Sequence, residues 1–254
     1  MTDALEAHIG ELRNSDRNVR GRAALDLGAR SDARAGDALI RALCVERDPF
    51  VRENITWALV RLGDAAVTPL IQLLRDADPQ IRHHAAHVLG KMRDPRALDA
   101  MIDVLRDDDA TVVAKAAFGL GQLGDPRAIL PLVALVGHES RELQSTLASV
   151  LERFGHSAVA PLVEALRHER WQVREQAASI LGLIENADAV PALIAASADR
   201  HWQSRFACAH ALGELGGQAA NAAVESMCGD EDARVRSLVE RYRGGRRNRS
   251  RKRC

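Results

Sequence analysis

The sequence predicts an all-α protein, an α-solenoid of about seven helix-pair repeats. Three observations predict this fold: a motif that recurs about every 31 residues, helix start and stop signals inside each repeat, and a composition that disfavours strands. Only 3% of the residues are aromatic, and no alternating apolar and polar run resembles a strand. Alanine and leucine supply most of the apolar content, which suits helices packed closely on helices.

The repeat is visible in the residue that opens each predicted first helix. These openers are Val19, Val51, Ile81, Val112, Leu143, Val173 and Val235, with Ser204 in the one place where the aliphatic residue is missing. A leucine follows eight residues after every opener from Val19 to Ser204. Such self-similarity at a fixed period is typical of repeat proteins.

Each repeat carries the local chemistry of two short helices. Asp78 is a predicted N-cap, and Pro79 follows at the first helical position, where its missing N–H costs nothing. Asp48 and Pro49 repeat this arrangement. In the segment 123–126 a glycine is expected to end one helix directly before Asp-Pro starts the next. A connection this short favours an antiparallel helix pair.

One helix pair cannot bury its apolar stripe alone, so the pairs are expected to stack into a continuous core. We expect residues 1–240 to form this solenoid, with repeats starting near 16, 48, 78, 109, 139, 169 and 200 and a partial repeat from 230. Residues 2–13 are predicted to be an N-terminal capping helix. The segment from about 232 to 242 is predicted to close the other end.

Charge divides the chain into an acidic body and a basic end. The 35 basic and 35 acidic residues cancel, but residues 241–254 hold eight of the basic ones and no acid, which leaves 27 basic against 35 acidic residues in the body. We expect residues 241–254 to be a disordered tail because they carry too much like charge to fold. The tail is a candidate contact for nucleic acid or an acidic protein. Its candidate residues are Arg246, Arg247, Arg249, Arg251, Lys252 and Arg253.

Several functional classes are disfavoured by what the sequence lacks. The four cysteines form no CxxC pair, which argues against a zinc ribbon or a thioredoxin-like site. No P-loop, GxSxG, HExxH or dinucleotide fingerprint occurs. No apolar run approaches a membrane span, and the N-terminus does not resemble a signal peptide. We therefore expect a soluble, cytoplasmic protein with no cofactor, no membrane contact and no catalytic residues.

The recurring motifs resemble the HEAT repeat family, in the short-repeat variety found in phycobilisome-lyase-like proteins. The matching motifs are the Asp-Pro-x-(Val/Ile)-Arg opening, the Ala-Ala pair, the Leu-Gly turn and the Gly-Asp-Pro-Arg-Ala connection, best seen over residues 78–106 and 109–136. The resemblance implies the fold and leaves the function open, because the family includes scaffolds, adaptors, chromophore lyases and a metal-dependent hydroxylase.

The resemblance also implies a ladder of arginines and turn aspartates. An arginine follows the opener at Arg20, Arg52, Arg82, Arg174, Arg205 and Arg236. The i,i+4 spacing of Asp48 to Arg52 and of Asp78 to Arg82 predicts ion pairs within one helix.

Three histidines form the candidate metal site. His83, His84 and His87 lie on one predicted helix, and the i,i+4 spacing of His83 and His87 is one that chelates metals. No nearby carboxylate or cysteine completes a site, so exposed, metal-free histidines are expected. In the resemblance to deoxyhypusine hydroxylase, paired His-Glu motifs would lie inside first helices, whereas 138–139 and 168–169 precede the openers here.

Two sets of residues are candidates for binding a partner. Trp171 and Trp202 both stand two residues before an opener, and they are either interface anchors or wedges between repeats. The second helices are expected to expose arginines among acids. These arginines are Arg41, Arg75, Arg106 and Arg167. A surface of mixed sign fits a protein or peptide better than a phosphate backbone.

The sequence therefore favours a protein–protein interaction scaffold or adaptor that is not an enzyme, with the arginine-rich tail as an accessory contact. A nucleic-acid-associated HEAT protein that binds through its tail is one alternative. A phycobilin-lyase-like or metal-dependent hydroxylase enzyme is the other.

Overall fold

The computed structural model describes residues 2–251, with the side chains of residues 4–244. Every regular secondary-structure element among these residues is an α-helix or a 3₁₀-helix. The first helices of the repeats are α2 (Arg17–Arg30), α4 (Pro49–Leu62), α6 (Pro79–Met92), α8 (Ala110–Leu123), α10 (Arg141–Phe154), α12 (Trp171–Ile184) and α14 (Trp202–Leu215). The second helices are α3 (Gly36–Val45), α5 (Asp64–Leu73), α7 (Leu98–Val104), α9 (Ile129–Val133), α11 (His156–Ala165), α13 (Val190–Ala196) and α15 (Gly217–Ser226). α1 (Thr2–Glu11) precedes these seven pairs and α16 (Ala233–Arg251) follows them. The all-α repeat fold is confirmed.

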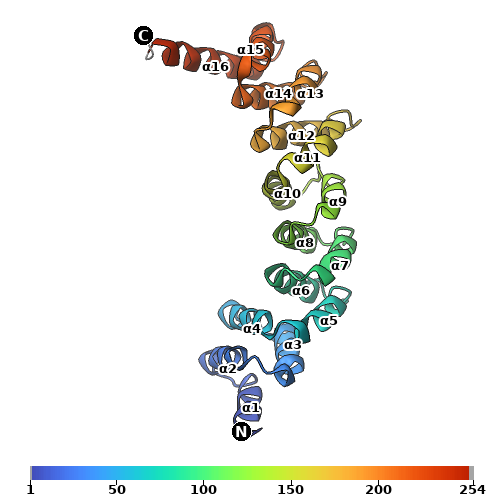
Figure 1. Cartoon of the computed structure of the whole chain (residues 1–254), viewed down its shortest axis with the longest axis vertical. Helices are drawn as coiled ribbons and strands as arrows, with labels where there is room; N and C mark the ends of the chain where they lie inside the picture. The colour runs from blue at the N-terminus through green and yellow to red at the C-terminus, as the bar shows by residue number, and fades with distance from the viewer. Residues whose placement is uncertain (1, 252–254) are drawn as a thin grey trace. The chain divides into compact units, whose positions relative to one another are not determined.

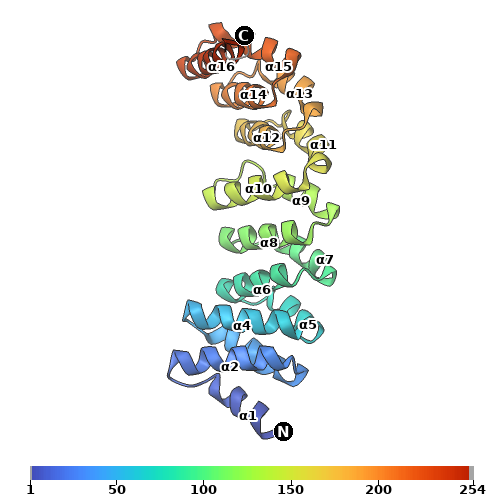
Figure 2. The ribbon, with the colours of Figure 1, turned by 60° about the vertical axis from the view of Figure 1, so that its left-hand side comes forward.

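The chain divides into two compact units, unit 1 over residues 1–125 and unit 2 over residues 126–254. Within unit 1, the first helices α2, α4, α6 and α8 stack in one layer, and α3, α5 and α7 stack beside them (Figure 1, Figure 2). Within unit 2, α10, α12, α14 and α16 form one layer and α9, α11, α13 and α15 the other. Each unit is therefore a two-layer stack of helix pairs.

The predicted helix signals act as expected. The carboxylate of Asp48 accepts the N–H groups of Phe50 and Val51, and Pro49 occupies the first turn of α4. Asp78 accepts the N–H of Gln80 at the start of α6 in the same way. These caps satisfy N–H groups that have no partner inside the helix.

Small residues let neighbouring first helices approach closely. A Cβ on Gly28 of α2 would lie 2.7 Å from the Cα of Ala58 in α4, and one on Gly90 of α6 would lie 2.8 Å from the Cα of Gly119 in α8. Because side chains never make contacts this short, the two backbones touch at these points. The core is then filled by the leucine of each first helix. Every one of them is fully buried: Leu27, Leu59, Leu89, Leu120, Leu151, Leu181 and Leu212.

The arginine ladder exists, but its partners differ from the predicted ones. Arg82 does not pair with Asp78; its Nε and Nη2 donate to the two carboxylate oxygens of Asp107 at 2.6 and 2.7 Å, and its Nη1 donates to the carbonyl of Asp76 at 2.9 Å. Asp78 is already used as the N-cap of α6. One arginine thus ties the turn before its own helix to the end of the second helix in the same repeat. The same arrangement joins Arg20 to Glu46, Arg174 to Asp199 and Arg205 to Asp230.

Three repeats lack the complete bridge. Arg52 does not pair with Asp48, and its guanidinium reaches only the carbonyl of Glu46, at 3.4 Å, among the described residues. Val113 stands in the arginine position of α8. Gln144 stands in that of α10 and donates a single hydrogen bond to the carbonyl of His138 at 2.6 Å. The ladder is therefore interrupted at the second repeat and again at the fourth and fifth.

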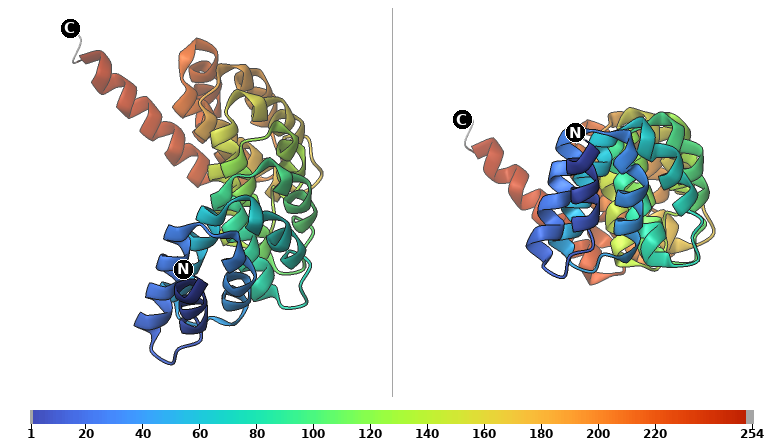
Figure 3. Two further views of the ribbon diagram at one scale, coloured as in Figure 1. Left: turned by 60° about the horizontal axis from the view of Figure 1, so that its bottom comes forward. Right: turned by 90° about the horizontal axis from the view of Figure 1, so that it is seen from below.

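The C-terminal segment differs from the expected disordered tail. α16 continues to Arg251 and extends past the other helices of unit 2 (Figure 3). Its middle is held in place because the Tyr242 hydroxyl donates to Glu214 at 2.6 Å and Arg243 pairs with Glu225 at 2.9 Å. The predicted nucleic-acid contacts lie beyond these anchors. Arg246, Arg247, Arg249 and Arg251 have a described backbone only, and Lys252 and Arg253 lie outside the described residues.

Over residues 2–251, the structure contains no helix that is both long enough and apolar enough to cross a bilayer.

We predict that breaking one ladder bridge destabilises the fold strongly. The side chains of Arg205 and Asp230 are only 8% and 7% exposed. Arg205→Gln leaves the buried carboxylate without its cation and should cost about 3–5 kcal/mol of unfolding free energy, measured by urea denaturation at pH 7. The hydrogen bond from Arg205 lowers the pKa of Asp230 below its usual value. The stability that this carboxylate contributes is therefore present above about pH 4 and lost as the pH falls through the lowered pKa.

Arg167→Gln is the matched control, since the Arg167–Glu164 pair is exposed on both sides and should contribute less than about 1 kcal/mol. Equal losses in the two variants would contradict a structural role for the buried bridge.

Candidate functional site

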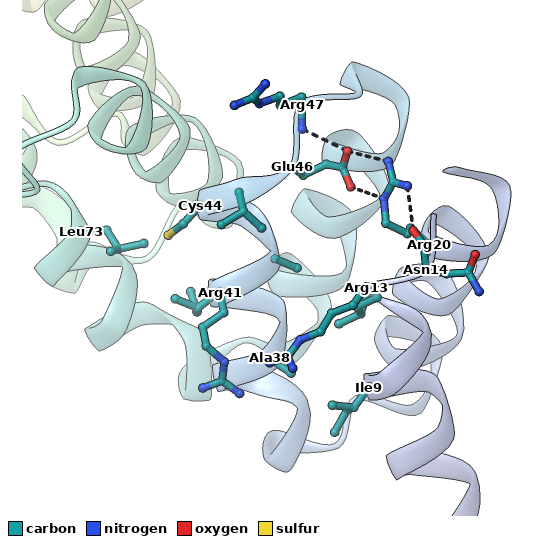
Figure 4. A pocket seen from close by; sticks show the side chains of 14 residues that line it. Ile9, Arg13, Asn14, Arg20, Ala38, Arg41, Cys44, Glu46, Arg47 and Leu73 are labelled. Atoms are coloured by element: carbon teal, nitrogen blue, oxygen red, sulfur yellow. Dashed lines mark hydrogen bonds and ion pairs between the residues drawn. The ribbon is translucent and has the colours of Figure 1, made fainter. Parts of the chain in front are cut away.

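A pocket of about 870 Å³ opens in unit 1 between α1, α3 and α5 (Figure 4). Its apolar surface comes from Ile9 of α1, Leu12 just after it, Ala38 and Ala42 of α3, and Leu73 of α5. A concave, mostly apolar surface of this size is typical of small-molecule sites.

The pocket exists because α1 only partly replaces a repeat. α1 packs mainly against α2, so the side of α3 that faces it has no full-length second helix before it. α3 presents the small side chains of Ala38 and Ala42 there, and Val45 at its end is 77% exposed. The N-terminal end of the stack therefore leaves an open groove over α3.

Positive charge surrounds this apolar floor. Arg13, Arg41 and Arg47 line the pocket, and their guanidinium groups make no hydrogen bond or ion pair with any described residue. Arg20 differs, because Glu46 neutralises it through the ladder bridge at 2.7 Å. Figure 4 shows the Arg13 side chain reaching toward α3, where Ala38 and Arg41 lie. The pocket thus combines an apolar surface with uncompensated cations.

A cysteine completes the wall of the pocket. Cys44 is half-buried there, and burial raises the pKa of its thiol above the usual value. The thiol therefore stays protonated at neutral pH and acts as a small apolar group.

The four predicted arginines are all exposed, but they do not form one site. Arg41 belongs to the pocket, whereas Arg75 and Arg106 line a separate, shallow hollow of about 170 Å³ between α5 and α7. Arg167, in unit 2, pairs with Glu164 at 3.2 Å. Arg167 also borders a wide-open hollow of about 460 Å³ in unit 2. Of the four arginines, Arg41 alone lines the pocket of about 870 Å³.

The two tryptophans make contacts within unit 2. The Trp171 ring stacks on His201 with centroids 5.9 Å apart, and the guanidinium of Arg234 lies 3.2 Å from the Trp202 ring centroid. Both rings are half-buried. Each covers the turn that starts the following first helix, as the wedge interpretation expects. Their role as interface anchors stays a prediction.

The three histidines are half-buried, not exposed as predicted. They pack in the stack of first helices, and Nδ1 of both His83 and His84 is buried without a hydrogen-bond partner. Burial, assisted by neighbouring cations, lowers the pKa of each of these two to about 4. His87 lies 3.6 Å from the carboxylate of Glu53. Over the described part of the chain, no group of three or more His, Cys, Asp or Glu side chains could hold a metal ion.

The His-Glu dipeptides lie in turns. Nδ1 of His138 accepts the N–H of Ser140 at 3.0 Å, and Nδ1 of His168 accepts the N–H of Arg170 at 3.1 Å. These imidazoles are occupied as turn caps before α10 and α12.

The chain is similar to a protein family and to a curated protein. A family model described as HEAT repeats matches residues 5–71, 64–118, 104–169 and 159–242. Bilin biosynthesis protein PecE of Mastigocladus laminosus is 44% identical over 63 residues, a segment that covers 24% of this chain and 23% of that protein.

Two solved structures are similar to this chain to different extents. The complex of CpcE and CpcF of phycocyanin lyase from a Nostoc species is 25% identical, with 94% of each chain covered and a TM-score of 0.46. Kap121p bound to Pho4p is 15% identical and has a TM-score of 0.57; the match covers 95% of this chain and 33% of that one. The Kap121p likeness shows the fold alone.

One prediction from the sequence is contradicted at this point. The absence of catalytic motifs led us to expect a protein that is not an enzyme, but the curated relative is named for bilin biosynthesis. That expectation relied on the absence of short catalytic motifs from the sequence. The pocket was also missed, since Ala38 and Ala42 have the composition of ordinary core positions. The available signal was the position of Arg41 between these two alanines on the same predicted helix.

We predict an acid-sensitive stability that originates in the histidine cluster. Because the folded-state pKa values of His83 and His84 lie below the unfolded value of about 6.5, the unfolded chain binds more protons between about pH 6.5 and pH 4. The unfolding free energy should therefore fall by roughly 2 kcal/mol for each of the two histidines between pH 7 and pH 5, and His83→Gln with His84→Gln should remove most of this slope. Imidazole NMR titrations that place both pKa values near 6.5 would disprove the assignment.

Proposed function

The chain belongs to the HEAT-repeat family, and from that premise we propose that it binds a bilin in the pocket on α3 and serves bilin biosynthesis. The single observation that carries the proposal is the pocket itself, an apolar floor flanked by guanidinium groups without partners. The name of the relative PecE, which matches about a quarter of this chain, supports it.

The chemistry of a bilin suits both parts of this pocket. A bilin is a linear tetrapyrrole whose conjugated body is largely apolar and whose two propionate side chains are anionic at neutral pH. The body would lie against Ile9, Ala38 and Ala42, which offer a surface without unpaired polar groups. The propionates would be held by Arg13 and Arg41, because guanidinium and carboxylate form charge-assisted, two-pronged hydrogen bonds.

The scaffold role becomes part of this proposal in a narrower form. A bilin held at the open end of a stack is accessible to a second protein, and helical repeats offer extended recognition surfaces. We propose that the exposed arginines Arg75 and Arg106, on the second-helix layer of unit 1, contact that second protein. They lie outside the pocket and therefore provide a control for the bilin experiment.

Titration of the purified chain with biliverdin tests the proposal. We expect saturable binding at one site, seen as a shift in the visible absorption and an induced circular dichroism signal. Arg13→Ala with Arg41→Ala removes two charge-assisted contacts worth about 1.5–3 kcal/mol each, so the affinity should fall at least tenfold. Arg75→Ala with Arg106→Ala removes the same charge from the same unit and should leave the affinity unchanged. Absence of binding, or equal weakening in both double variants, would overturn the proposal.

A further inference from the structure

We propose that the outer face of the first helices in unit 1 is a docking surface for an acidic amphipathic helix of another protein. This surface is separate from the pocket on α3, and the inference does not depend on bilin binding. It rests on a row of exposed apolar side chains, on the charges beside that row and on the spacing between its members.

The row occupies one register position in four successive helices. Leu25, Trp57, His87 and Phe118 each stand six residues after the opener of α2, α4, α6 and α8. Leu25, Trp57 and Phe118 are 39%, 41% and 44% exposed, whereas the polar side chain of His87 is half-buried. The four helices lie side by side in Figure 2. We call these four residues the first-helix stripe.

The stripe is continuous between α2 and α4. The Trp57 ring leans toward α2, since a Cβ on Gly28 would lie 2.7 Å from its Cζ3. The ring therefore covers the space between its own helix and the helix that carries Leu25. An exposed row that combines tryptophan, leucine and phenylalanine has the composition of an interface centre.

The same register position in unit 2 supplies an internal comparison. There it holds Ser149 in α10, Ser179 in α12 and His210 in α14. Folding of a first helix therefore does not require a large apolar residue at this position. The stripe of unit 1 is a feature that packing alone does not demand.

Basic side chains lie along the stripe. One helical turn away from its members, on the same helix faces, stand Arg22, Arg61, Lys91 and Lys115, against the single acid Glu53. The Arg61 guanidinium lies 5.2 Å from the Trp57 ring centroid, and Lys91 pairs with Glu53 at 2.5 Å. Residues 1–240 carry more acids than bases, whereas four of these five charged residues are basic. Charge complementarity selects an acidic partner.

The spacing selects a helix as the form of that partner. Packed helices lie about 8–10 Å apart, so the register position recurs about every 8–10 Å over a length of about 25–30 Å, with apolar anchors on α2, α4 and α8. An α-helix laid across the four first helices rises about 10.5 Å in seven residues and reaches about 30 Å in 20 residues. Apolar residues repeated once per heptad would therefore meet successive anchors, with acids between them facing the cations. In an extended strand, the side chains on one face recur about every 6.8 Å, a spacing that does not match the spacing of the helices in this layer.

The test uses a synthetic 21-residue peptide with leucine once per heptad among glutamate and alanine. Its binding to the full chain is followed by fluorescence anisotropy of a label on the peptide. The comparison peptide has the same composition in scrambled order. We expect the patterned peptide to bind at least tenfold more tightly than the scrambled one, and its affinity should fall as salt is raised.

Two variant pairs separate docking from folding. Trp57→Ser with Phe118→Ser should weaken binding at least tenfold, and serine is the residue that α10 and α12 already carry in this register. Leu130→Ser with Leu183→Ser removes exposed apolar side chains elsewhere, 69% and 50% exposed, and should change nothing. Should the first pair unfold the chain, Arg22→Glu with Lys115→Glu keeps the apolar residues and should still abolish binding. Equal affinity for both peptides, an unchanged affinity in either stripe variant, or tighter binding of a single-stranded oligonucleotide to the same face would overturn the proposal.

Discussion

Each helix pair in this chain depends on its neighbours, because two short helices cannot cover their own apolar face. The leucine eight residues after each opener reaches full burial only between adjacent pairs. The ladder arginines then fix the turns: Arg82, for example, joins the carbonyl of Asp76 to the carboxylate of Asp107. Buried apolar contact supplies the cohesion of the stack, and these charged bridges determine how each turn connects to the second helix of its repeat.

The candidate binding surfaces follow from this dependence. Wherever a pair lacks a full neighbour, apolar surface stays open, and the pocket over α3 arises because α1 covers α2 more than α3. The first-helix stripe has a different origin, since helices in one layer always leave an outer face to solvent. Unit 1 places Trp57 and Phe118 on that face where unit 2 places serine. Both surfaces carry positive charge on a body that is acidic as a whole.

The repeat period, caps and buried leucines were predictable because they depend on residues close in sequence. The ladder partners were not, since Asp107 lies 25 positions after Arg82 and local spacing favoured Asp78. The end of the last helix was not predictable for a similar reason. The composition of residues 241–254 indicated disorder, whereas Tyr242 bonds to Glu214, which lies 28 positions earlier in the sequence. The pocket depends on which helix α1 covers, a tertiary fact that Ala38 and Ala42 do not reveal. The prediction of a protein that is not an enzyme relied on missing catalytic motifs, and it is contradicted by a relative named for bilin biosynthesis.

The claim that buried bridges hold the turns of the stack is tested most directly by native-state hydrogen–deuterium exchange across unit 2. Gln144 in α10 makes one hydrogen bond to the preceding turn, whereas Arg174 in α12 bridges a turn and a buried carboxylate. If the bridges hold the turns, the amides of α10 and of residues 138–140 should exchange faster than those of α12 and of residues 168–170. Gly137 is excluded from the comparison because Gln176 and Arg170 bond to its backbone. Equal protection of the two segments would contradict the claim.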